Sequence, residues 1–500
     1  RSPTADGEMV DDDLKTAACR RTAKIRQYVA AILVSLLGFC LGTSLGWVSP
    51  MQPLLTSPHP PVGTQPMSEG TIAWLGSINF IGSAIGTFFW GIAADRMGRK
   101  TAASLVAIPF IASWTLILAA QNTTWLIIAR IVAGIGNSGA TVNVPIFISE
   151  IAQDDLRGFF GSFLILFINI GVLFSYVIGT YLKYNWLAIC CMTVPVIFVL
   201  TFIWLPETPM FYWKNGQTNK AEQSLLWYRG GDENETEKVL SKYKTISRNQ
   251  YKKPSLKSLV ATTGTTKALI IGIALMTSVQ GSGIFPILNF AVSIFDMCGT
   301  SLTAYQSAII MGTVQFIFTC FCSVLVDRLG RKVLLVGSLM TMTVSLLVLG
   351  SYLFFLANQS MNPILRGIPI VSLSLHVIAF AVGVGPVPFI IMAEIFPPEI
   401  RGLAMSQLQL ITGILAFTTV KLFPIMKKFL KPQGCFWFYS FCCLVFSIFF
   451  SFYLPETKGK PQNVILKLLN KEDLTNYDTN EVTKNIKEKQ SLPLVQKDNV

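Results

Sequence analysis

Charge is scarce in this sequence. Only 13% of its 500 residues are Asp, Glu, Lys or Arg, whereas 52% are hydrophobic. A soluble core cannot hide that much apolar surface, so the bilayer must act as the solvent of this chain. Long runs of alternating polarity, which would indicate a membrane barrel, are missing as well. Helices are therefore the expected spans, because they satisfy their own backbone hydrogen bonds in lipid.

The groupings that catalysis requires are also missing. We recognise no nucleophile beside a base, no cluster of metal ligands and no Gly-rich phosphate loop, so we expect no enzyme, no cofactor and no bound metal. The net charge of +13 does not indicate nucleic-acid binding. The basic residues lie in short loops and in one central interval, and not on an aromatic-rich soluble module.

Apolar blocks of about 20 residues, the length that crosses about 30 Å of hydrocarbon, recur about twelve times. We place the first six at 27–49, 71–93, 101–120, 124–148, 158–181 and 186–205. After a polar interval, the others lie at 267–290, 303–326, 333–356, 367–392, 402–424 and 434–454. The sequence thus predicts an all-α integral membrane protein built from two six-helix bundles.

The distribution of Lys and Arg predicts the orientation. The loop at 50–70 has neither residue, whereas the loops on the other side are rich in both. The positive-inside rule then places both termini in the cytoplasm. Lys427, Lys428 and Lys431 break this rule on the outer side. The expected parts are an inner tail at 1–26, a bundle at 27–205, cytoplasmic helices or a mere linker at 206–266, a second bundle at 267–454 and an inner tail at 455–500.

Three motifs recur in the same order in both halves. D-R-M-G-R-K at 95–100 returns as D-R-L-G-R-K at 327–332. An E-x6-R-G pattern ends at Gly158 and again at Gly402, and P-E-T at 206–208 returns at 455–457. Ordered duplication predicts two bundles related by a pseudo-twofold axis, which is typical of transporters with a midplane site.

The duplicated loops pair acids with bases. Since Arg grips a carboxylate with two parallel hydrogen bonds, we expect a cytoplasmic latch that holds the bundles together when the site faces outward. The alternative is a set of ordinary positive-inside anchors, which would need no Glu. The expected latch residues are Asp95, Arg96, Arg99, Glu150 and Arg157, and in the second half Asp327, Arg328, Arg331, Glu394 and Arg401.

With G-V-G-P-V-P at 383–388 and P-E-T-K-G at 455–459, these motifs resemble the sugar porter family of the major facilitator superfamily. F-I-N-I-G-V-L around Asn169 and T-V-K-L-F around Lys421 resemble the insect facilitated trehalose and hexose transporters within it. The resemblance implies the major facilitator fold and facilitated transport of a sugar or polyol by alternating access. We expect a monomeric multi-pass protein of the cell membrane, whose partners are the solute and the lipid bilayer.

The resemblance places the sugar on spans five, seven, eight, ten and eleven, where this sequence departs from the family pattern. Val279 and Phe285 stand where span seven usually has Gln and Asn. Each unpaired substrate hydroxyl costs roughly 1–3 kcal/mol, so the named sugar stays open. The candidate substrate-binding residues are Gln280, Ser282, Asn289, Gln315, Phe389 and Thr412.

Two other functions stay open: a transport-inactive sugar sensor, and a proton-coupled carrier of a different small polar solute. Ser44 stands where proton-coupled relatives carry Asp, and a hydroxyl carries no charge at neutral pH. His376 is the one titratable group at mid-depth that changes charge near neutrality. Asn122 and Asn358 begin sequons on the outer side and are candidate glycosylation sites.

Overall fold

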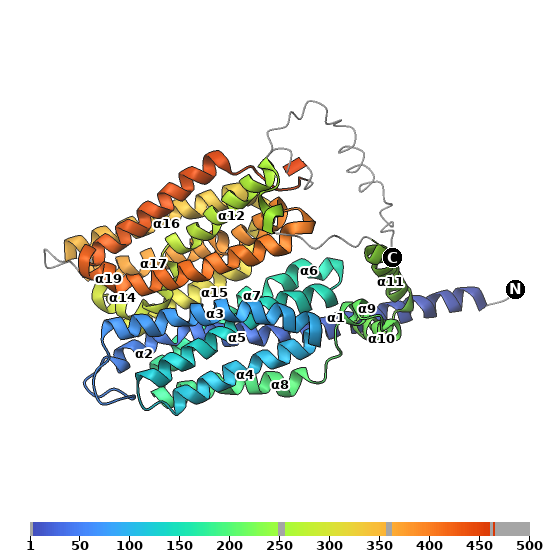
Figure 1. Ribbon diagram of the computed structural model, residues 1–500, viewed down its shortest axis with the longest axis horizontal. Helices are drawn as coiled ribbons and strands as arrows, with labels where there is room; N and C mark the ends of the chain where they lie inside the picture. Colours follow the sequence, from blue (N-terminus) through green and yellow to red (C-terminus); the bar gives the residue numbers. More distant parts are fainter. Residues whose placement is uncertain (1–3, 249–255, 357–362, 461–463, 466–500) are drawn as a thin grey trace.

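The computed structural model describes residues 4–248, 256–356, 363–460 and 464–465. All regular elements within these residues are helical. Figure 1 shows the blue-to-green helices of the first half gathered in one bundle and the helices of the second half, yellow-green at α12 and red at the end of α19, in another. The fold class predicted from the sequence is confirmed.

Eight helices form the first half: α1 (Thr4–Gly46), α2 (Val48–Leu55), α3 (Glu69–Met97), α4 (Arg99–Leu118), α5 (Thr123–Ile151), α6 (Asp154–Gly161), α7 (Phe163–Tyr181) and α8 (Tyr184–Phe202). Three short helices follow: α9 (Pro209–Lys214), α10 (Thr218–Tyr228) and α11 (Glu233–Arg248). The second half contains α12 (Thr263–Gly281), α13 (Ile284–Asn289), α14 (Ala291–Cys298), α15 (Ala304–Leu329), α16 (Arg331–Leu356), α17 (Ile368–Ala379), α18 (Val387–Ile395) and α19 (Pro398–Tyr453). Single-turn elements lie at Leu256–Val260, Pro363–Gly367 and Phe380–Val384.

The number of passes depends on the last helix. Among the described residues, 11 helices are long and apolar enough to cross a membrane, and the last covers 54 residues. At 1.5 Å per residue it would be about 80 Å long, whereas a bilayer core measures about 30 Å. The helix is broken at Lys431, whose backbone is non-helical (φ 59°, ψ 166°). This element therefore makes two passes, which agrees with the expected total.

Two expected spans are not continuous helices. The span expected at 267–290 stops at Gly281 and restarts at Ile284, with Gly283 between them in the left-handed region (φ 75°). The span expected at 367–392 passes through a π-helical turn at Phe380–Val384 before α18 begins. Pro386 and Pro388 contribute no backbone N–H to this segment, which explains why a regular helix cannot run through it. Broken helices at such depth expose backbone groups where a transporter holds its solute.

The three short helices pack against the first half. Arg26 of α1 donates to the carbonyl of Trp227 at 2.8 Å, and Gln27 donates to that of Tyr228 at 2.9 Å. Arg229 donates to the carbonyl of Ile151, at the end of α5, at 2.9 Å. Figure 1 shows α9, α10 and α11 beside the amino-terminal part of α1. These helices therefore belong structurally with the first bundle.

Candidate functional site

A chain of polar side chains joins the two halves inside the bundle. Asn169 of α7 donates to the hydroxyl of Thr319 at 2.8 Å and accepts from the amide of Gln315 at 3.0 Å. Thr319 and Gln315 belong to α15, in the other half, and all three side chains are buried. Polar groups at this depth are costly in lipid and mark functional positions. We call Asn169, Gln315 and Thr319 the amide bridge.

Further amides on the broken span remain unsatisfied. The side chain of Gln280 is 1% exposed, and neither its amide nitrogen nor its oxygen has a hydrogen-bond partner in the described part of the chain. Asn289 donates to the carbonyl of Phe285 at 2.9 Å, but its side-chain oxygen has no such partner. A Cβ added at Gly76 of α3 would lie 3.5 Å from that oxygen. Asn289 therefore faces the first half across the bundle interface.

The other candidate binding residues behave differently. The hydroxyl of Ser282 donates to the carbonyl of Val279 at 2.7 Å, and that of Thr412 donates to Leu408 at 2.8 Å. Both bonds stay within local backbone, so neither hydroxyl is held toward the amide bridge. Phe389 is 38% exposed, which does not match the closed surroundings of Gln280. The structure brings Asn169, Gln315 and Asn289 to the junction of the halves, and the binding role of Ser282, Thr412 and Phe389 stays a prediction.

Asn169 was not among the site residues expected from the sequence, although its motif supported the family resemblance. The usable signal was an isolated Asn within the apolar run I-L-F-I-N-I-G-V-L. Asn79 of α3 and Asn137 of α5 give a similar signal. Both are buried, and each has at least one side-chain atom without a described partner. An isolated amide within an apolar run is therefore a signal for a buried polar position in this chain.

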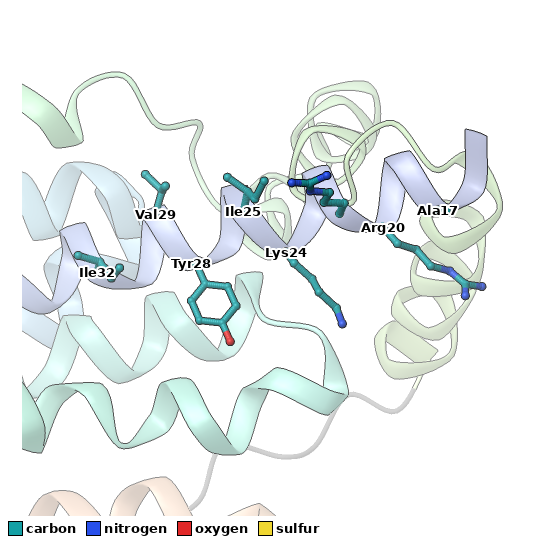
Figure 2. A pocket seen from close by; sticks show the side chains of 8 residues that line it. Ala17, Arg20, Lys24, Ile25, Tyr28, Val29 and Ile32 are labelled. Atoms are coloured by element: carbon teal, nitrogen blue, oxygen red, sulfur yellow. The ribbon is translucent and has the colours of Figure 1, made fainter. Parts of the chain in front are cut away.

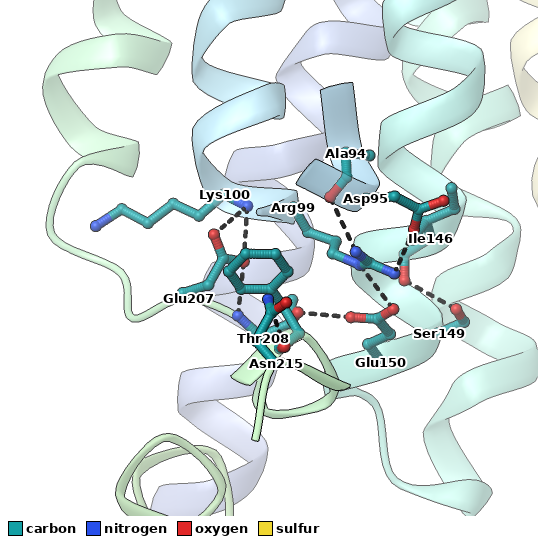
Figure 3. Close-up of polar contacts among 11 residues, drawn as sticks. Ala94, Asp95, Arg99, Lys100, Ile146, Ser149, Glu150, Glu207, Thr208 and Asn215 are labelled. Carbon is teal, nitrogen blue, oxygen red and sulfur yellow. Dashed lines mark hydrogen bonds and ion pairs between the residues drawn. The ribbon is translucent and has the colours of Figure 1, made fainter. Parts of the chain in front are cut away.

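Figure 3 shows an ion-pair network at the end of the first half that carries the duplicated loops. Arg99 contacts Glu150 at 2.9 Å and Asp95 at 3.2 Å, and donates to the carbonyl of Ala94 at 2.9 Å. The second carboxylate oxygen of Glu150 accepts from the hydroxyl of Thr208. The P-E-T motif thus joins the same network as the D-R-x-G-R-K loop.

The Glu of each P-E-T motif caps the start of a long helix. Glu207 accepts from the backbone N–H of Lys100 at 2.8 and 3.0 Å, at the start of α4. Glu456 accepts from the N–H groups of Arg331 and Lys332 at 3.0 and 3.1 Å, at the start of α16. A carboxylate at this position satisfies free N–H donors and complements the helix dipole. Sequence reasoning noticed the repeated motif but missed this role.

Glycine is required where these carboxylates approach. Gly98 and Gly330 have φ values of 101° and 90°. A Cβ at Gly98 would lie 2.3 Å from a carboxylate oxygen of Glu207, and one at Gly330 would lie 3.0 Å from Glu456. The invariant spacing of D-R-x-G-R-K in the two halves therefore encodes a backbone turn and a carboxylate site together.

The two capping carboxylates differ in their proton affinity. Burial raises the pKa of Glu207, and this effect outweighs its hydrogen bonds from the backbone. Burial also acts to raise the pKa of Glu456, but backbone N–H groups of Lys458, Arg331 and Lys332 lower it overall. On acidification, Glu207 therefore takes up a proton before Glu456 does.

Among the remaining expected latch residues, those with a described contact bond to residues of their own half. Arg331 contacts Glu394 at 3.3 Å, Arg157 contacts Asp154 at 3.2 Å, and Arg401 donates to the carbonyl of Phe396 at 3.3 Å. Arg96 and Arg328 are exposed. The side chain of Asp327 lies outside the described residues. The ion pairs described at this end thus join residues of one half, and the latch role stays a prediction.

At the opposite end, polar contacts cross between the halves. Lys427 of α19 forms an ion pair with Glu69 of α3. The Nζ atom of Lys421 lies 4.0 Å from the ring centroid of Trp74, and it donates a hydrogen bond to the carbonyl of Gly70 at 3.4 Å. We call Glu69, Trp74, Lys421 and Lys427 the far-end lock. It accounts for one lysine, Lys427, that broke the positive-inside pattern.

Contacts of α2 with α14 and α15 strengthen the same junction. The backbone N–H of Val292 donates to Ser49 at 3.0 Å, and Tyr305 donates to the carbonyl of Pro50 at 3.4 Å. Ser49 and Pro50 belong to the first half, whereas Val292 and Tyr305 belong to the second. The bundles are therefore held together at the end away from the duplicated loops.

Two buried groups and two sequons complete the sequence-derived candidates. Arg130 donates to the carbonyls of Leu75 at 2.9 Å and Ser44 at 2.6 Å. His376 is fully buried, and neither ring nitrogen has a partner among the described residues. The side chain of Asn122 is exposed and caps α5 by accepting from Thr124 and Trp125. Asn358 lies outside the described residues.

One family model and several known proteins match most of this chain. The family model described as "Sugar (and other) transporter" matches residues 30–467. A facilitated trehalose transporter of Culex quinquefasciatus is 31% identical over 437 residues, which cover 87% of this chain and 84% of that protein. The facilitated glucose transporter member 8 of solute carrier family 2 from Bos taurus is 31% identical over 456 residues, covering 87% and 92%.

Solved structures show the same fold. The inward-open xylose transporter XylE from E. coli superposes with a TM-score of 0.72 at 22% identity, covering 89% of this chain and 99% of that one. Its partially occluded inward-open form gives 0.70 at 19% identity, covering 86% and 100%.

The loop glycine gives the first prediction. G98A should lower the melting temperature in detergent for two reasons. A residue other than Gly rarely adopts the positive φ of this position, and holding Ala there costs about 1–3 kcal/mol. The new Cβ would also displace the side chain of Glu207. G91A is the control, since a Cβ there meets nothing within 4 Å and Ala favours a helix. Equal melting temperatures for both variants would show that Gly98 is not required.

Proposed function

This chain belongs to the family of sugar and other transporters, and we propose that it moves a sugar or polyol across the cell membrane by facilitated, uncoupled alternating access. Its relatives by name carry trehalose or glucose, which makes trehalose or a hexose the first substrates to test. The amide bridge is the observation that carries the proposal. Amides both donate and accept, as the hydroxyls of a sugar also do. Because both halves of the site come from one chain, we take the monomer as the working unit.

The substrate would exchange hydrogen bonds with the bridge. Asn169 holds Gln315 and Thr319 at 3.0 and 2.8 Å only while no hydroxyl competes for them. Gln280 and Asn289, which retain unsatisfied side-chain atoms, supply further partners from the broken span. A sugar ring that replaces the bridge bonds would let the halves separate without leaving buried amides unpaired, which would otherwise cost about 1–3 kcal/mol each.

Replacing single amides tests this site. Q280A and N169A should each weaken sugar uptake into proteoliposomes at least several-fold, mainly through a higher KM, because a hydroxyl partner is lost. Q121A, an exposed glutamine outside the bundle, is the matched control. Unchanged uptake in both amide variants at normal reconstitution would place the site elsewhere. Sugar binding by the parent with no uptake of any sugar in a panel would favour a sensor instead.

Alternating access needs a junction at each end. With the duplicated loops and both termini in the cytoplasm, the far-end lock lies on the outer face. It would hold the outer ends together while the site faces inward. We propose that Glu150, Glu394 and their arginines favour the opposite state, by bringing the inner ends together when the site faces outward.

Opposite responses at the two ends test this scheme. A cysteine at Ser293, which lines a small hollow beside Glu69 and Lys427, reports outer access through an impermeant thiol reagent. E69Q should speed its labelling, because the lock loses an ion pair, whereas E394Q should slow it. The charge swap E69K with K427E should return labelling toward the parent rate. Equal labelling in all variants would reduce both sets of residues to anchors.

Uncoupled transport gives a further prediction. An inward pH gradient across proteoliposomes should leave the final internal sugar concentration equal to the external one, because no carboxylate is seen to bond to the amide bridge within the described part of the chain. H376Q removes the single buried imidazole, and H59Q changes the other, exposed histidine of the chain as a control. Accumulation above the external concentration that disappears in H376Q alone would establish proton coupling.

A further inference from the structure

An open hollow in the described surface lies away from the amide bridge, along the amino-terminal part of α1. It encloses about 780 Å³ and is lined by Ala17, Arg20, Arg21, Lys24, Ile25, Tyr28, Val29 and Ile32. Figure 2 shows these side chains on one stretch of helix, with the basic residues toward the amino terminus and the apolar ones toward the bundle. We call these residues the α1 stripe.

The opposite side of α1 is covered, so the stripe is a distinct open face. The carbonyl of Cys19 lies against Gly230 in the linker, where an added Cβ would come within 2.2 Å. Ala23 and Gln27, one and two turns further on, are buried. By contrast, Ile25, Val29 and Ile32 are 55%, 45% and 42% exposed. Large apolar side chains so open to the surroundings need an apolar partner.

Contacts of Gln27 fix the depth of the stripe. Its side-chain oxygen accepts from the backbone N–H of Gln153 at 3.0 Å, just after α5 ends. Gln27 therefore lies at the level where α5 leaves the bundle, close to the inner membrane surface. At 1.5 Å per residue, Arg20 to Lys24 lie about 5–10 Å beyond that level, in the headgroup layer, while Val29 and Ile32 lie within hydrocarbon.

The surroundings of the stripe indicate the bilayer and not the solute pathway. Tyr28 contacts the rings of Phe159 and Phe160 of α6 at 6.1 and 4.9 Å between centroids. Both aromatic partners of Tyr28 thus belong to a helix of the first half. An occupant of this face would therefore be a neighbour in the inner leaflet.

We propose that the α1 stripe binds an anionic phospholipid of the inner leaflet, with the phosphate on Arg20, Arg21 and Lys24 and an acyl chain along Ile25, Val29 and Ile32. The order of charge and apolar surface along the helix matches the order of headgroup and chain in the lipid. Each basic residue near an anionic headgroup strengthens binding about fivefold. The orientation rests on the proposed function, because it requires the amino terminus to be cytoplasmic.

Binding is measured by native mass spectrometry of the full chain, extracted from vesicles of phosphatidylcholine with or without phosphatidylserine. The triple variant R20Q/R21Q/K24Q should bind phosphatidylserine with a roughly hundredfold lower apparent affinity, because it lacks three positive charges that each contribute about fivefold. The control K214Q/K220Q/K244Q removes the same charge from exposed positions of the linker helices. It should retain the lipid as the parent does.

Two results would overturn the proposal. One is equal loss of phosphatidylserine from both triple variants, which would reduce the effect to net charge. The other is full displacement of the lipid by soluble glycerophosphoserine, which would show that the apolar half of the stripe binds nothing. Uptake in the same vesicles separates this inference from the proposed function. Retained phosphatidylserine in a parent that transports no sugar would refute transport and leave the lipid site standing.

Discussion

Hydrocarbon offers no hydrogen-bond partners, and this constraint governs every polar group inside the two bundles. Asn169, Gln315 and Thr319 bond to one another across the interface, and Arg130 donates to backbone carbonyls of two other helices. The side-chain oxygen of Gln315 and one guanidinium nitrogen of Arg130 have no partner among the described residues. Each of these contacts ties helices together when it forms and leaves costly unpaired groups when it breaks. A solute rich in hydroxyls is one of the few partners that can replace them inside a membrane. The polar side chains of the interior therefore hold the two bundles together where they reach across the interface.

The duplicated motifs show how a short sequence pattern builds the same structure twice. In each half a glycine with positive φ begins a long helix, and the Glu of a distant P-E-T motif caps the N–H groups that this start leaves free. The arginine next to that glycine then contacts a Glu from the E-x6-R-G pattern. Three motifs far apart in sequence therefore meet because each satisfies a group that another leaves exposed.

The sequence predicted those features that depend on hydrophobic length and on repetition. Spans and halves follow from apolar block length and from the duplicated order. The duplicated order also singled out the acids and bases of the loops, but as a latch between the bundles, and the Arg99–Glu150 and Arg331–Glu394 pairs within each half were not predicted. The sequence did not predict the interruption at Gly283, because an apolar window looks the same whether or not its helix is broken. It also left Asn169 out of the expected site residues. Ser282 and Thr412 bond to local backbone, and their expected role in binding stays a prediction. A hydroxyl can be satisfied within its own helix, which a pattern of residue types does not reveal.

The two ends of the molecule are held in different ways, and this asymmetry bears on how it moves. At the far end, Lys427 and Lys421 reach from α19 to Glu69 and Trp74 of α3, so opening this end must break contacts between halves. At the loop end, Arg99 and Arg331 already have carboxylate partners within their own halves. Among the described residues, opening the far end therefore breaks contacts between the halves, whereas the ion pairs described at the loop end stay within one half.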